Sequence, residues 1–353
     1  MLNSMGMGGI ENFLMNLYRS IDREEYQFDF ILQSKEEGYF EKEIKELGGN
    51  IYKIPRIEKQ PLKHLTELRK ILKSNEYIAF HRHTANSIVF VDLAIAQFCN
   101  IANVIVHSHS TSHSNEKLNK IFRPLLYSLA DKHLACGQAA GEWLYGNKEF
   151  QIINNGMQLE KYEYSEEKRN ACREKFGLAP TDIVLGHVGR FNDVKNQKYM
   201  IEVFEELTKL NNQYKLVFCG DGELRGELSL YCKENGLDGK VIFLGVRKDI
   251  HEILQAFDLF VFPSKYEGVP LALIEPQLTG LTCFVSKNVP DEAIYNGNIL
   301  KIGIEENDKE TWIKQIIELP VTTAYRTYKN EKLYSDYDIK KVAEKLSDVW
   351  GRP

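Results

Sequence analysis

The 353-residue sequence has no long apolar run: nowhere do eighteen apolar residues follow one another, so no membrane-spanning helix is expected. Its first residues, MLNSMGMGGIEN, lack the charged and then apolar layout of a secretory signal peptide. The six cysteines include no C-x-x-C pair, which favours reduced thiols in a cytoplasmic protein. Low-complexity tracts, heptad arrays and short repeats are missing as well.

An excess of positive charge is also missing, because 45 Lys and Arg residues face 50 Asp and Glu residues and the net charge is −5. The whole chain therefore has no attraction to nucleic acid or anionic lipid, and any such contact has to be local. We expect no nucleic-acid partner. An apolar content of 43% and a charged content of 27% are typical of globular proteins, and the length suffices for two domains.

Both halves of the chain alternate short apolar runs with amphipathic stretches, which predicts parallel sheets with helices on both faces. In the first half we expect strands at 26–32, 50–54, 77–81, 102–109, 132–136 and 150–153, and helices at 10–21, 37–47, 61–74, 86–99, 115–130 and 138–145. In the second half we expect strands at 182–188, 215–220, 241–245, 259–263 and 282–286, and helices at 196–210, 223–235, 249–257, 270–279 and 337–350.

The alternation is interrupted near residues 154–156, and the polar stretch EKYEYSEEKRN at 160–170 suits a connection between domains. We therefore expect a first domain over 1–160 and a second over 161–336. The last segment, 337–353, is expected to pack back on the first domain.

The stretch PSKYEGVPLALIEPQLTGL at 263–281 combines a turn with an apolar helix. Pro270 suits a first helical turn, which places a helix N-terminus beside Gly268 and Val269 and predicts a phosphate site there. Glu267 would lie beside the phosphate and Glu275 two turns deeper, which is the layout of a nucleotide-sugar pocket. The simpler alternative is that both are ordinary surface glutamates.

Other turns of the second half end at the same edge of a parallel sheet, where ligands bind. GRFNDVKNQ offers Arg190 and Lys195 as a clamp for a diphosphate, unless they form a solvated loop pair. GDGELRG does not complete a G-x-G-x-x-G fingerprint. In GVRKD, the backbone of Val246 could meet a base edge.

With GRFNDVKNQ, LVFCGDGELRGEL, FLGVRKDIHEIL and EGVPLALIE in this order, the chain resembles the retaining glycosyltransferases of family 4. Within that family it is most similar to the bacterial capsule and exopolysaccharide type. The resemblance runs nearly end to end and includes GMGGIENFLMNLYR, VIVHSHST and the closing helix. It implies an α/β protein with the GT-B fold, in which two doubly wound Rossmann-like domains face a central cleft.

The resemblance also implies roles in the second domain. Arg190 and Lys195 match the basic pair that holds the donor diphosphate, Glu267 matches the glutamate beside the donor sugar, and Glu275 matches the one that holds the ribose. Val246, Gly268 and Val269 complete the expected donor site.

In the first domain, Gly8 and Gly9 match the glycine loop near the diphosphate. His109 aligns with the histidine that faces the donor sugar, although His107 lies two residues away on the same face. His109, Glu267, Arg190 and Lys195 are thus expected to act in catalysis.

The resemblance implies transfer of a hexose with retention from a nucleotide sugar, UDP-linked rather than GDP-linked, to a glycan or polyprenyl-linked acceptor in surface polysaccharide synthesis. No cofactor is expected, because the protein cations replace a metal. We expect a cytoplasmic enzyme, and the basic and apolar stretch 115–133 offers a membrane contact at the inner face of the cell membrane. The alternative for this stretch is an ordinary helix, interrupted by Pro124, that packs on the first domain.

Two departures from the family matter. Pro276 follows Glu275 where alanine is usual, which removes a helical hydrogen bond. Only Met1 to Ser4 stand where the family's first strand precedes the glycine loop, so we expect an open slot in the first sheet or a reading frame that begins upstream.

Two other functions stay open. One is a non-catalytic GT-B subunit that binds a nucleotide sugar or a partner transferase. The other is a metal-dependent hydrolase, because six of the nine histidines fall in the first half. These are His81, His83, His107, His109, His113 and His133. The lack of an H-E-x-x-H motif weakens this second alternative.

Overall fold

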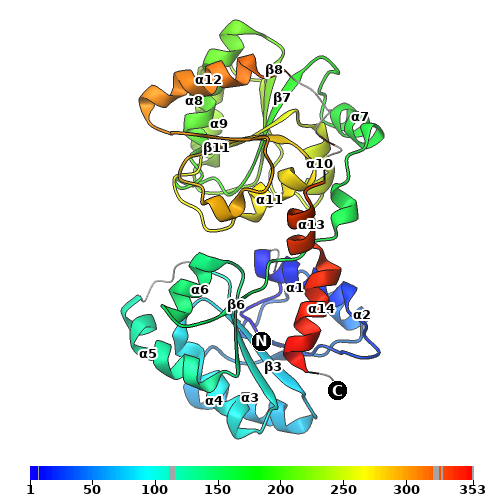
Figure 1. The fold of residues 1–353 in the computed structure, drawn as a ribbon, viewed down its shortest axis with the longest axis vertical. Helices are drawn as coiled ribbons and strands as arrows, with labels where there is room; N and C mark the ends of the chain where they lie inside the picture. Colours follow the sequence, from blue (N-terminus) through cyan, green and yellow to red (C-terminus); the bar gives the residue numbers. More distant parts are fainter. Residues whose placement is uncertain (7, 111–115, 321–325, 327–328, 352–353) are drawn as a thin grey trace. The chain divides into compact units, whose positions relative to one another are not determined.

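The computed structural model describes residues 1–6, 8–110, 116–320, 326 and 329–351. Its contacts divide the chain into two compact units, which we call the first and the second unit (Figure 1). The first unit comprises Met1–Gln158 and Ser335–Pro353, and the second comprises Leu159–Tyr334. None of the described helices has the length and apolar content to cross a membrane.

The first unit contains a parallel sheet in the order β3-β4-β5-β6 and a parallel pair, β1 and β2. The strands are β1 (Phe30–Leu32), β2 (Ile51–Lys53), β3 (Ala79–Thr84), β4 (Asn103–Ser108), β5 (Lys132–Ala135) and β6 (Gln151–Ile152). The helices are α1 (Gly9–Ser20), α2 (Glu41–Glu46), α3 (Pro61–Ser74), α4 (Phe90–Phe98), α5 (Glu116–Leu129), α6 (Gln138–Tyr145) and α14 (Ile339–Trp350).

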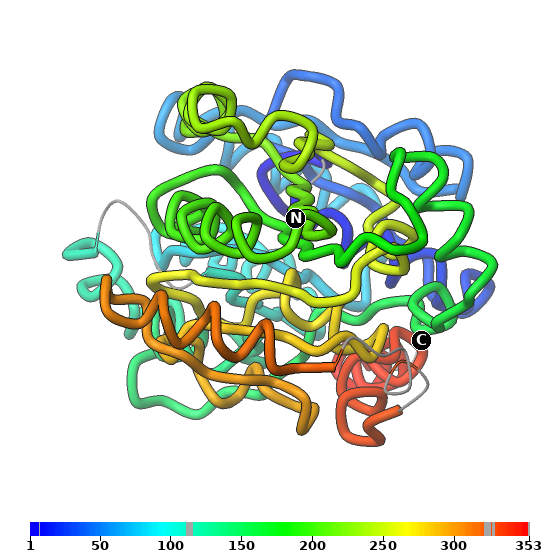
Figure 2. The backbone as a smooth tube through the Cα atoms, turned by 90° about the horizontal axis from the view of Figure 1, so that it is seen from above, coloured from blue at the N-terminus to red at the C-terminus, as the bar shows by residue number. Residues whose placement is uncertain are grey.

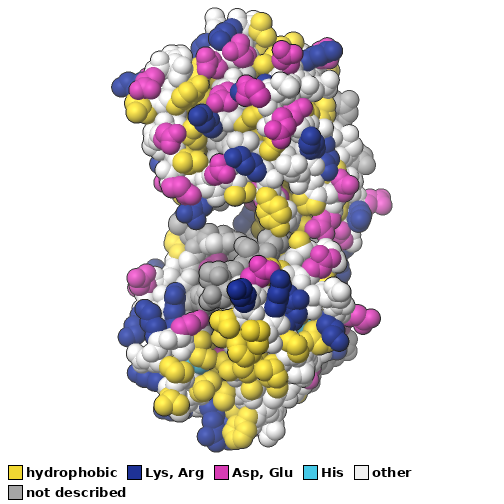
Figure 3. All heavy atoms as spheres, turned by 90° about the vertical axis from the view of Figure 1, so that its left-hand side faces the viewer, with side chains coloured by type: hydrophobic (Ala, Val, Ile, Leu, Met, Phe, Trp, Pro, Cys, Tyr) yellow, Lys and Arg dark blue, Asp and Glu magenta, His cyan; other side chains and the backbone are white. Residues whose placement is uncertain are grey.

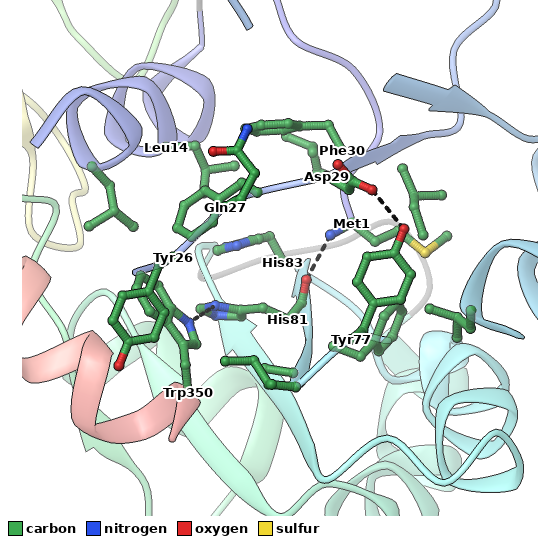
Figure 4. A pocket seen from close by; sticks show the side chains of 18 of the residues that line it. Met1, Leu14, Tyr26, Gln27, Asp29, Phe30, Tyr77, His81, His83 and Trp350 are labelled. Atoms are coloured by element: carbon green, nitrogen blue, oxygen red, sulfur yellow. Dashed lines mark hydrogen bonds between the residues drawn. The ribbon is translucent and has the colours of Figure 1, made fainter. Parts of the chain in front are cut away.

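Residues Met1 to Asn3 lie between β1 and β3. The Leu2 N–H donates to Ile31 O at 3.1 Å, and the His83 N–H donates to Met1 O at 3.1 Å. A cavity of about 350 Å³ lies beside them, and its lining includes Met1 and Phe30 (Figure 4). The first residues therefore lie between the two strands and border this cavity.

Helix α14 packs on α1 within the first unit, beside it in Figure 1. It begins after Asp338, whose side chain accepts from the Lys340 N–H at 3.0 Å as an N-cap. Ile339, Val342 and Leu346 repeat at helical spacing and are buried in the same cluster as residues of α1. Burying each such side chain contributes about 1.5–3 kcal/mol to the stability of the fold. Helix α14 therefore helps to hold the core of the first unit together.

The second unit contains one parallel sheet in the order β12-β11-β10-β7-β8-β9. Its strands are β7 (Ile183–Val188), β8 (Tyr214–Cys219), β9 (Val241–Phe243), β10 (Leu259–Phe262), β11 (Thr282–Ser286) and β12 (Ile299–Ile302). Its helices are α7 (Glu166–Lys175), α8 (Gln197–Leu210), α9 (Arg225–Glu234), α10 (Ile250–Ala256), α11 (Leu271–Leu278), α12 (Lys309–Glu318) and α13 (Glu331–Tyr337).

The strand order of this sheet reverses between β7 and β10, which are paired neighbours. Loops that leave the carboxyl ends of such strands diverge and form a crevice. On one face of the sheet α8 and α12 lie side by side, green and orange in Figure 2, with the Tyr199 and Trp312 rings 6.0 Å apart.

The sequence analysis was wrong about part of the connecting stretch 160–170. Residues from Glu166 onward form α7, which Ser165 caps by accepting from the Lys168 N–H at 3.3 Å. Arg169 and Arg173 on this helix are buried and both pair with Asp258, Arg173 at 2.6 Å. Within 160–170 only the charge of Arg169 is therefore buried in the second unit, whereas Glu166, Glu167 and Lys168 are exposed.

Candidate functional site

The loops after β7 and β10 bring Lys195 and Glu267 together. Lys195 Nζ lies 2.6 Å from Glu267 Oε1, and the two side chains are only 17% and 11% exposed. The ammonium group also lies 4.7 Å from the centre of the Phe262 ring. The cation and the carboxylate thus stand in a fixed position at the point where the strand order reverses.

Helix α11 begins directly beside this pair. The structure corrects the expected place of Pro270: it is the N-cap, one position before the first helical residue, Leu271. Its carbonyl accepts from the Leu273 and Ile274 N–H groups, and no side chain caps the helix. Gly268 and Val269 are half-buried just ahead of it, and no hydrogen bond from their N–H groups is found among the described residues, as a phosphate site at a helix N-terminus requires.

Arg190 does not contact Lys195 or Glu267 in this state. Its guanidinium lies 3.2 Å from Glu223 Oε2, and the two side chains are 71% and 56% exposed. Such an exposed pair contributes about 0–1 kcal/mol and is easily exchanged for another anion. Arg190 is therefore free to turn toward a ligand.

The glycines of GDGELRG serve close packing of the loops. A Cβ added to Gly220, whose φ is +141°, would lie 2.0 Å from Gly189 O. A Cβ on Gly222 would lie 2.3 Å from Phe191 O. The loop after β8 therefore lies directly against the loop that carries Arg190, and only glycine permits this approach.

Glu275 occupies the second turn of α11 and accepts a 2.7 Å hydrogen bond from the Tyr162 hydroxyl. Burial raises the pKa of Glu275 to about 7, although the bond from Tyr162 lowers it. Tyr162 comes from a 3₁₀ turn at Leu159–Tyr162 and was missed, because nothing in its local sequence distinguishes it from other tyrosines.

Val246 lies past the end of β9 and is exposed. The Gly220 N–H donates to Gly245 O at 2.8 Å, which joins the loop after β9 to the loop after β8. The loops after β7, β8 and β9 thus form a continuous rim, with Val246 at its far end.

In the first unit Gly8 is the N-cap of α1 and Gly9 its first residue. A Cβ on Gly9 would have nothing within 4 Å, so its position is open. One turn further, the Phe13 ring lies 5.9 Å from the ring of His109. Helix α1, which begins at the glycine loop, therefore packs against His109 through Phe13.

Four of the six histidines form a cluster at the ends of β3 and β4, namely His81, His83, His107 and His109. His83 Nδ1 lies 2.8 Å from His109 Nε2. Burial lowers the pKa of His109 to about 3 and the pKa values of the others well below the usual range, so the rings are neutral.

Nitrogens of His81, His83 and His107 lie within 4.8 Å of one another, and within the described residues this group includes no carboxylate. His81 Nδ1 accepts from the Trp350 indole N–H at 3.3 Å (Figure 4). His133 lies apart, stacked on Tyr127 at 3.7 Å, and His113 is outside the described residues. Of the six histidines, only these three lie close enough together among the described residues to meet one metal ion.

Two family models match consecutive parts of the chain. The model described as Glycosyltransferase Family 4 matches residues 7–161, and the model described as Glycosyl transferases group 1 matches residues 168–327.

Known proteins match over most of their length. The chain is 33% identical over 304 residues to the putative glycosyltransferase EpsF of Bacillus subtilis, covering 82% of this chain and 79% of that protein. It is 28% identical over 370 residues to the UDP-Gal:alpha-D-GlcNAc-diphosphoundecaprenol alpha-1,3-galactosyltransferase of Escherichia coli, covering 98% and 94%.

Among solved structures, Anabaena HepE in complex with UDP superposes with a TM-score of 0.79 at 20% identity, covering 98% of this chain and 97% of that one. This likeness shows the fold. Taken with the two family models and the EpsF relative, it establishes that the chain belongs to the family 4 glycosyltransferases and has the GT-B fold.

Proposed function

We propose that this glycosyltransferase moves a hexose, with retention of configuration, from a UDP-sugar to a glycan or polyprenyl-linked acceptor in surface polysaccharide synthesis. The observation that carries the proposal is the Lys195–Glu267 pair at the uncapped N-terminus of α11, where the strand order of the second unit reverses. This arrangement would place a phosphate beside the helix N-terminus and Lys195, with the Glu267 carboxylate next to an attached sugar.

The chemistry requires charge stabilisation on both sides of the breaking bond. As the nucleotide leaves the sugar C1 atom, negative charge grows on its phosphates and positive charge on the sugar ring. Lys195, Arg190 and the N–H groups of Gly268 and Val269 would stabilise the phosphates, and Glu267 would face the ring. The positive charges of Lys195 and Arg190 support a metal-independent reaction.

The rest of the donor would extend from this point along the rim. Glu275 would accept hydrogen bonds from the ribose hydroxyls, with Tyr162 holding its carboxylate, and the backbone of Val246 would meet the base. UDP rather than GDP is supported by the HepE complex with UDP and by the UDP-Gal substrate in the name of the Escherichia coli relative.

Gly8, Gly9 and His109 would contribute from the first unit. The open position at Gly9 admits a diphosphate or an acceptor, and His109 Nδ1 is buried without a hydrogen-bond partner among the described residues. His109 would bond a hydroxyl of the donor sugar. The expected cleft between the two domains stays a prediction.

The acceptor and the place of action are supported by relatives and by α5. Two relatives are named for diphospho-undecaprenol substrates, which lie in a membrane. Helix α5 exposes Leu118, Ile121 and Leu125 beside the exposed Lys117. Figure 3 shows apolar side chains gathered on the side of the first unit where Figure 1 places α5, with Lys and Arg around them. Contact with an anionic inner membrane face would use this surface.

Turnover by the purified protein tests the proposal. We expect release of UDP from one member of a panel of UDP-sugars when a lipid-linked acceptor extract is added, without loss of rate in EDTA. Proton NMR of the product should show the anomeric configuration of the donor. Binding of UDP without any turnover would favour the non-catalytic alternative, and activity restricted to GDP-sugars would contradict the choice of base.

A further inference from the structure

Gln197, the first residue of α8, is buried at the end of the loop that carries Arg190. Its side chain is only 1% exposed, and its amide nitrogen donates to the Arg190 carbonyl at 2.8 Å. The same nitrogen lies 3.4 Å from Nε2 of His187, a buried residue of β7. Strand β7 and helix α8 are both labelled in Figure 1. One buried amide therefore joins the start of this loop to its end.

The directions of these hydrogen bonds are fixed by the groups at either end. The Val261 carbonyl in β10 can only accept, so His187 Nδ1, which lies 2.9 Å away, carries a proton. Burial lowers the pKa of His187 to about 4, so the ring is neutral and its Nε2 is an acceptor. The Arg190 carbonyl is an acceptor as well. The two hydrogens of the Gln197 amide nitrogen are therefore the donors to both groups.

The opposite orientation of the Gln197 amide is excluded by the same contacts. It would turn Oε1, which can only accept, toward the Arg190 carbonyl and toward Nε2 of His187, and neither could donate to it. In the observed orientation Oε1 is buried and has no hydrogen-bond partner among the described residues. A buried oxygen without a partner lowers the stability of a fold. Packing alone therefore does not account for a glutamine at this position.

Lys195, the other cation of the predicted clamp, is held by different contacts. Its ammonium group pairs with Glu267 at 2.6 Å, and its N–H donates to the Asn192 side chain at 3.0 Å. The Arg190 side chain is 71% exposed and pairs only with the exposed Glu223 among the described residues. The place of the Arg190 guanidinium therefore depends on where its main chain is held.

We propose that Gln197 is a positioning residue that holds the main chain of Arg190 against the buried His187 ring, so that the guanidinium reaches the donor diphosphate from a fixed point. The inference rests on the proposed function, in which Arg190 binds that diphosphate. Because Gln197 is buried, it acts through Arg190 and does not itself touch the donor.

Two substitutions remove the bond to Arg190. Gln197→Met keeps the length of the side chain but has no donor, and Gln197→Asn keeps the amide but is one methylene group too short to reach the Arg190 carbonyl. Gln255→Met is the matched control. Gln255 is a buried glutamine of α10 whose side-chain hydrogen bonds join α10 to the stretch before α7, and none of them goes to the loops after β7 and β10.

Hydrogen exchange of the protein without ligand tests the positioning itself. We expect the amides of residues 189–196 to exchange on the order of tenfold faster in both Gln197 variants than in the native protein and in Gln255→Met. Unchanged exchange over 189–196 would overturn the proposal, and faster exchange over the whole second unit would reduce Gln197 to a packing role. Because this readout needs neither donor nor turnover, it decides the inference even if the proposed transferase activity fails.

A double-variant cycle gives the second readout. Gln197→Met should weaken UDP binding and lower kcat, each on the order of tenfold, with a melting temperature that changes no more than in Gln255→Met. In an Arg190→Ala background the same substitution should lose most of this effect, because the residue through which it acts is gone. Losses that multiply independently in the double variant would show that Gln197 does not act through Arg190. A native protein that bound no UDP would contradict the proposed function and leave the exchange result standing.

Discussion

Lys195 Nζ lies 2.6 Å from Glu267 Oε1, so the expected phosphate cation and the expected sugar carboxylate form one ion pair within the second unit. Arg190 instead pairs with Glu223 at the surface. The two cations of the predicted clamp therefore start from different states: Lys195 is already in position, whereas Arg190 has to exchange partners.

Removing either cation should slow transfer. Lys195→Ala and Arg190→Ala are each expected to lower kcat by on the order of 10²-fold or more, because each removes a positive charge that would stabilise the leaving phosphates. The melting temperature should change little for Arg190→Ala, whose side chain is exposed. Lys198→Ala, an exposed lysine on α8, is the control. Near-normal turnover in the double variant would contradict the clamp.

Substitutions of Glu267 and Glu275 should separate the binding of UDP from the transfer of the sugar. Glu267→Ala is expected to slow transfer with little effect on UDP affinity, whereas Glu275→Gln should weaken UDP binding. The carboxylate form of Glu275 accepts the ribose hydroxyls, and its pKa is about 7 in the free protein. UDP affinity should therefore rise with pH and level off above 7, falling by up to about tenfold per pH unit below it.

Calorimetric titration of UDP from pH 5.5 to 8.5 measures this dependence. The protonation of UDP itself changes over this pH range in the same way for all variants. Its contribution to the measured affinity therefore cancels when Glu275→Gln is used as the reference. Tyr162→Phe should move the midpoint upward, because the hydrogen bond from Tyr162 lowers the pKa of Glu275. Identical pH profiles for the native protein and Glu275→Gln would exclude Glu275 from the ribose site.

A buried charge network should make the stability of the first unit depend on pH. His64 bonds the Pro55 carbonyl at 2.7 Å through Nδ1 and Asp92 at 2.7 Å through Nε2, and Arg82 bonds the other oxygen of Asp92 at 2.8 Å. Burial favours neutral His64, but the bond to Asp92 and its charge outweigh burial and raise the pKa of His64 above 6.5.

The stabilisation by protonated His64 is therefore complete below pH 6.5 and is lost as pH rises through the higher pKa of the folded state. Urea unfolding of His64→Gln should show a larger loss of unfolding free energy at pH 5.5 than at pH 8.5. Asp92→Asn, which leaves Arg82 without its counter-charge, should cost about 3–5 kcal/mol. A loss for His64→Gln that is equal at both pH values would show that His64 is neutral.

The apolar side chains of α5 should anchor the protein to anionic vesicles. Ile121 is 63% exposed, and replacing Ile121 and Leu125 by Asp removes apolar area and adds negative charge. Co-flotation with phosphatidylglycerol vesicles at low salt is expected to be lost in this variant and retained in Leu62→Asp, which alters an exposed leucine of α3. Failure of the native protein to float with the vesicles would contradict the proposed membrane contact.

The cavity beside Met1 should accept an engineered strand. An extension of about five apolar, β-branched residues placed before Met1 would lie between β1 and β3 and cover the cavity lining, so the melting temperature should rise by several degrees. The same extension with two central prolines cannot pair with both strands and should not stabilise. Equal melting temperatures for the two would show that the cavity does not take a strand.

Much of the fold could be predicted because buried parallel strands are continuous apolar runs. The strands from β1 to β11 and the parallel pairing are confirmed. Strand β12 was missed because Ile299–Ile302 is a short edge strand that includes Lys301, which pairs with Asp291. Helix α7 was missed because its buried Arg169 and Arg173 look like surface charge until Asp258, more than eighty residues away, is brought beside them.

The candidate site was predictable where residues follow strand ends directly. Lys195 and Glu267 lie 72 positions apart in sequence, and the parallel sheet alone brings them into contact. Contacts without a periodic pattern could not be predicted: the Tyr162–Glu275 bond and the His83–His109 bond both depend on side-chain positions that only tertiary packing determines.

Helix α14 is made last but belongs to the first unit, which has a consequence for folding during translation. The Trp350 ring meets the Phe28 ring edge to face, with centroids 5.1 Å apart, and the Trp350 carbonyl accepts from the Asn103 side chain at 2.8 Å. The last turn of α14 therefore completes a core whose other residues are made first. On the ribosome the second unit can finish folding while the first still waits for α14. A nonsense mutation just before Asp338 should accordingly yield a chain whose early half is digested by proteases while Leu159–Tyr334 survives.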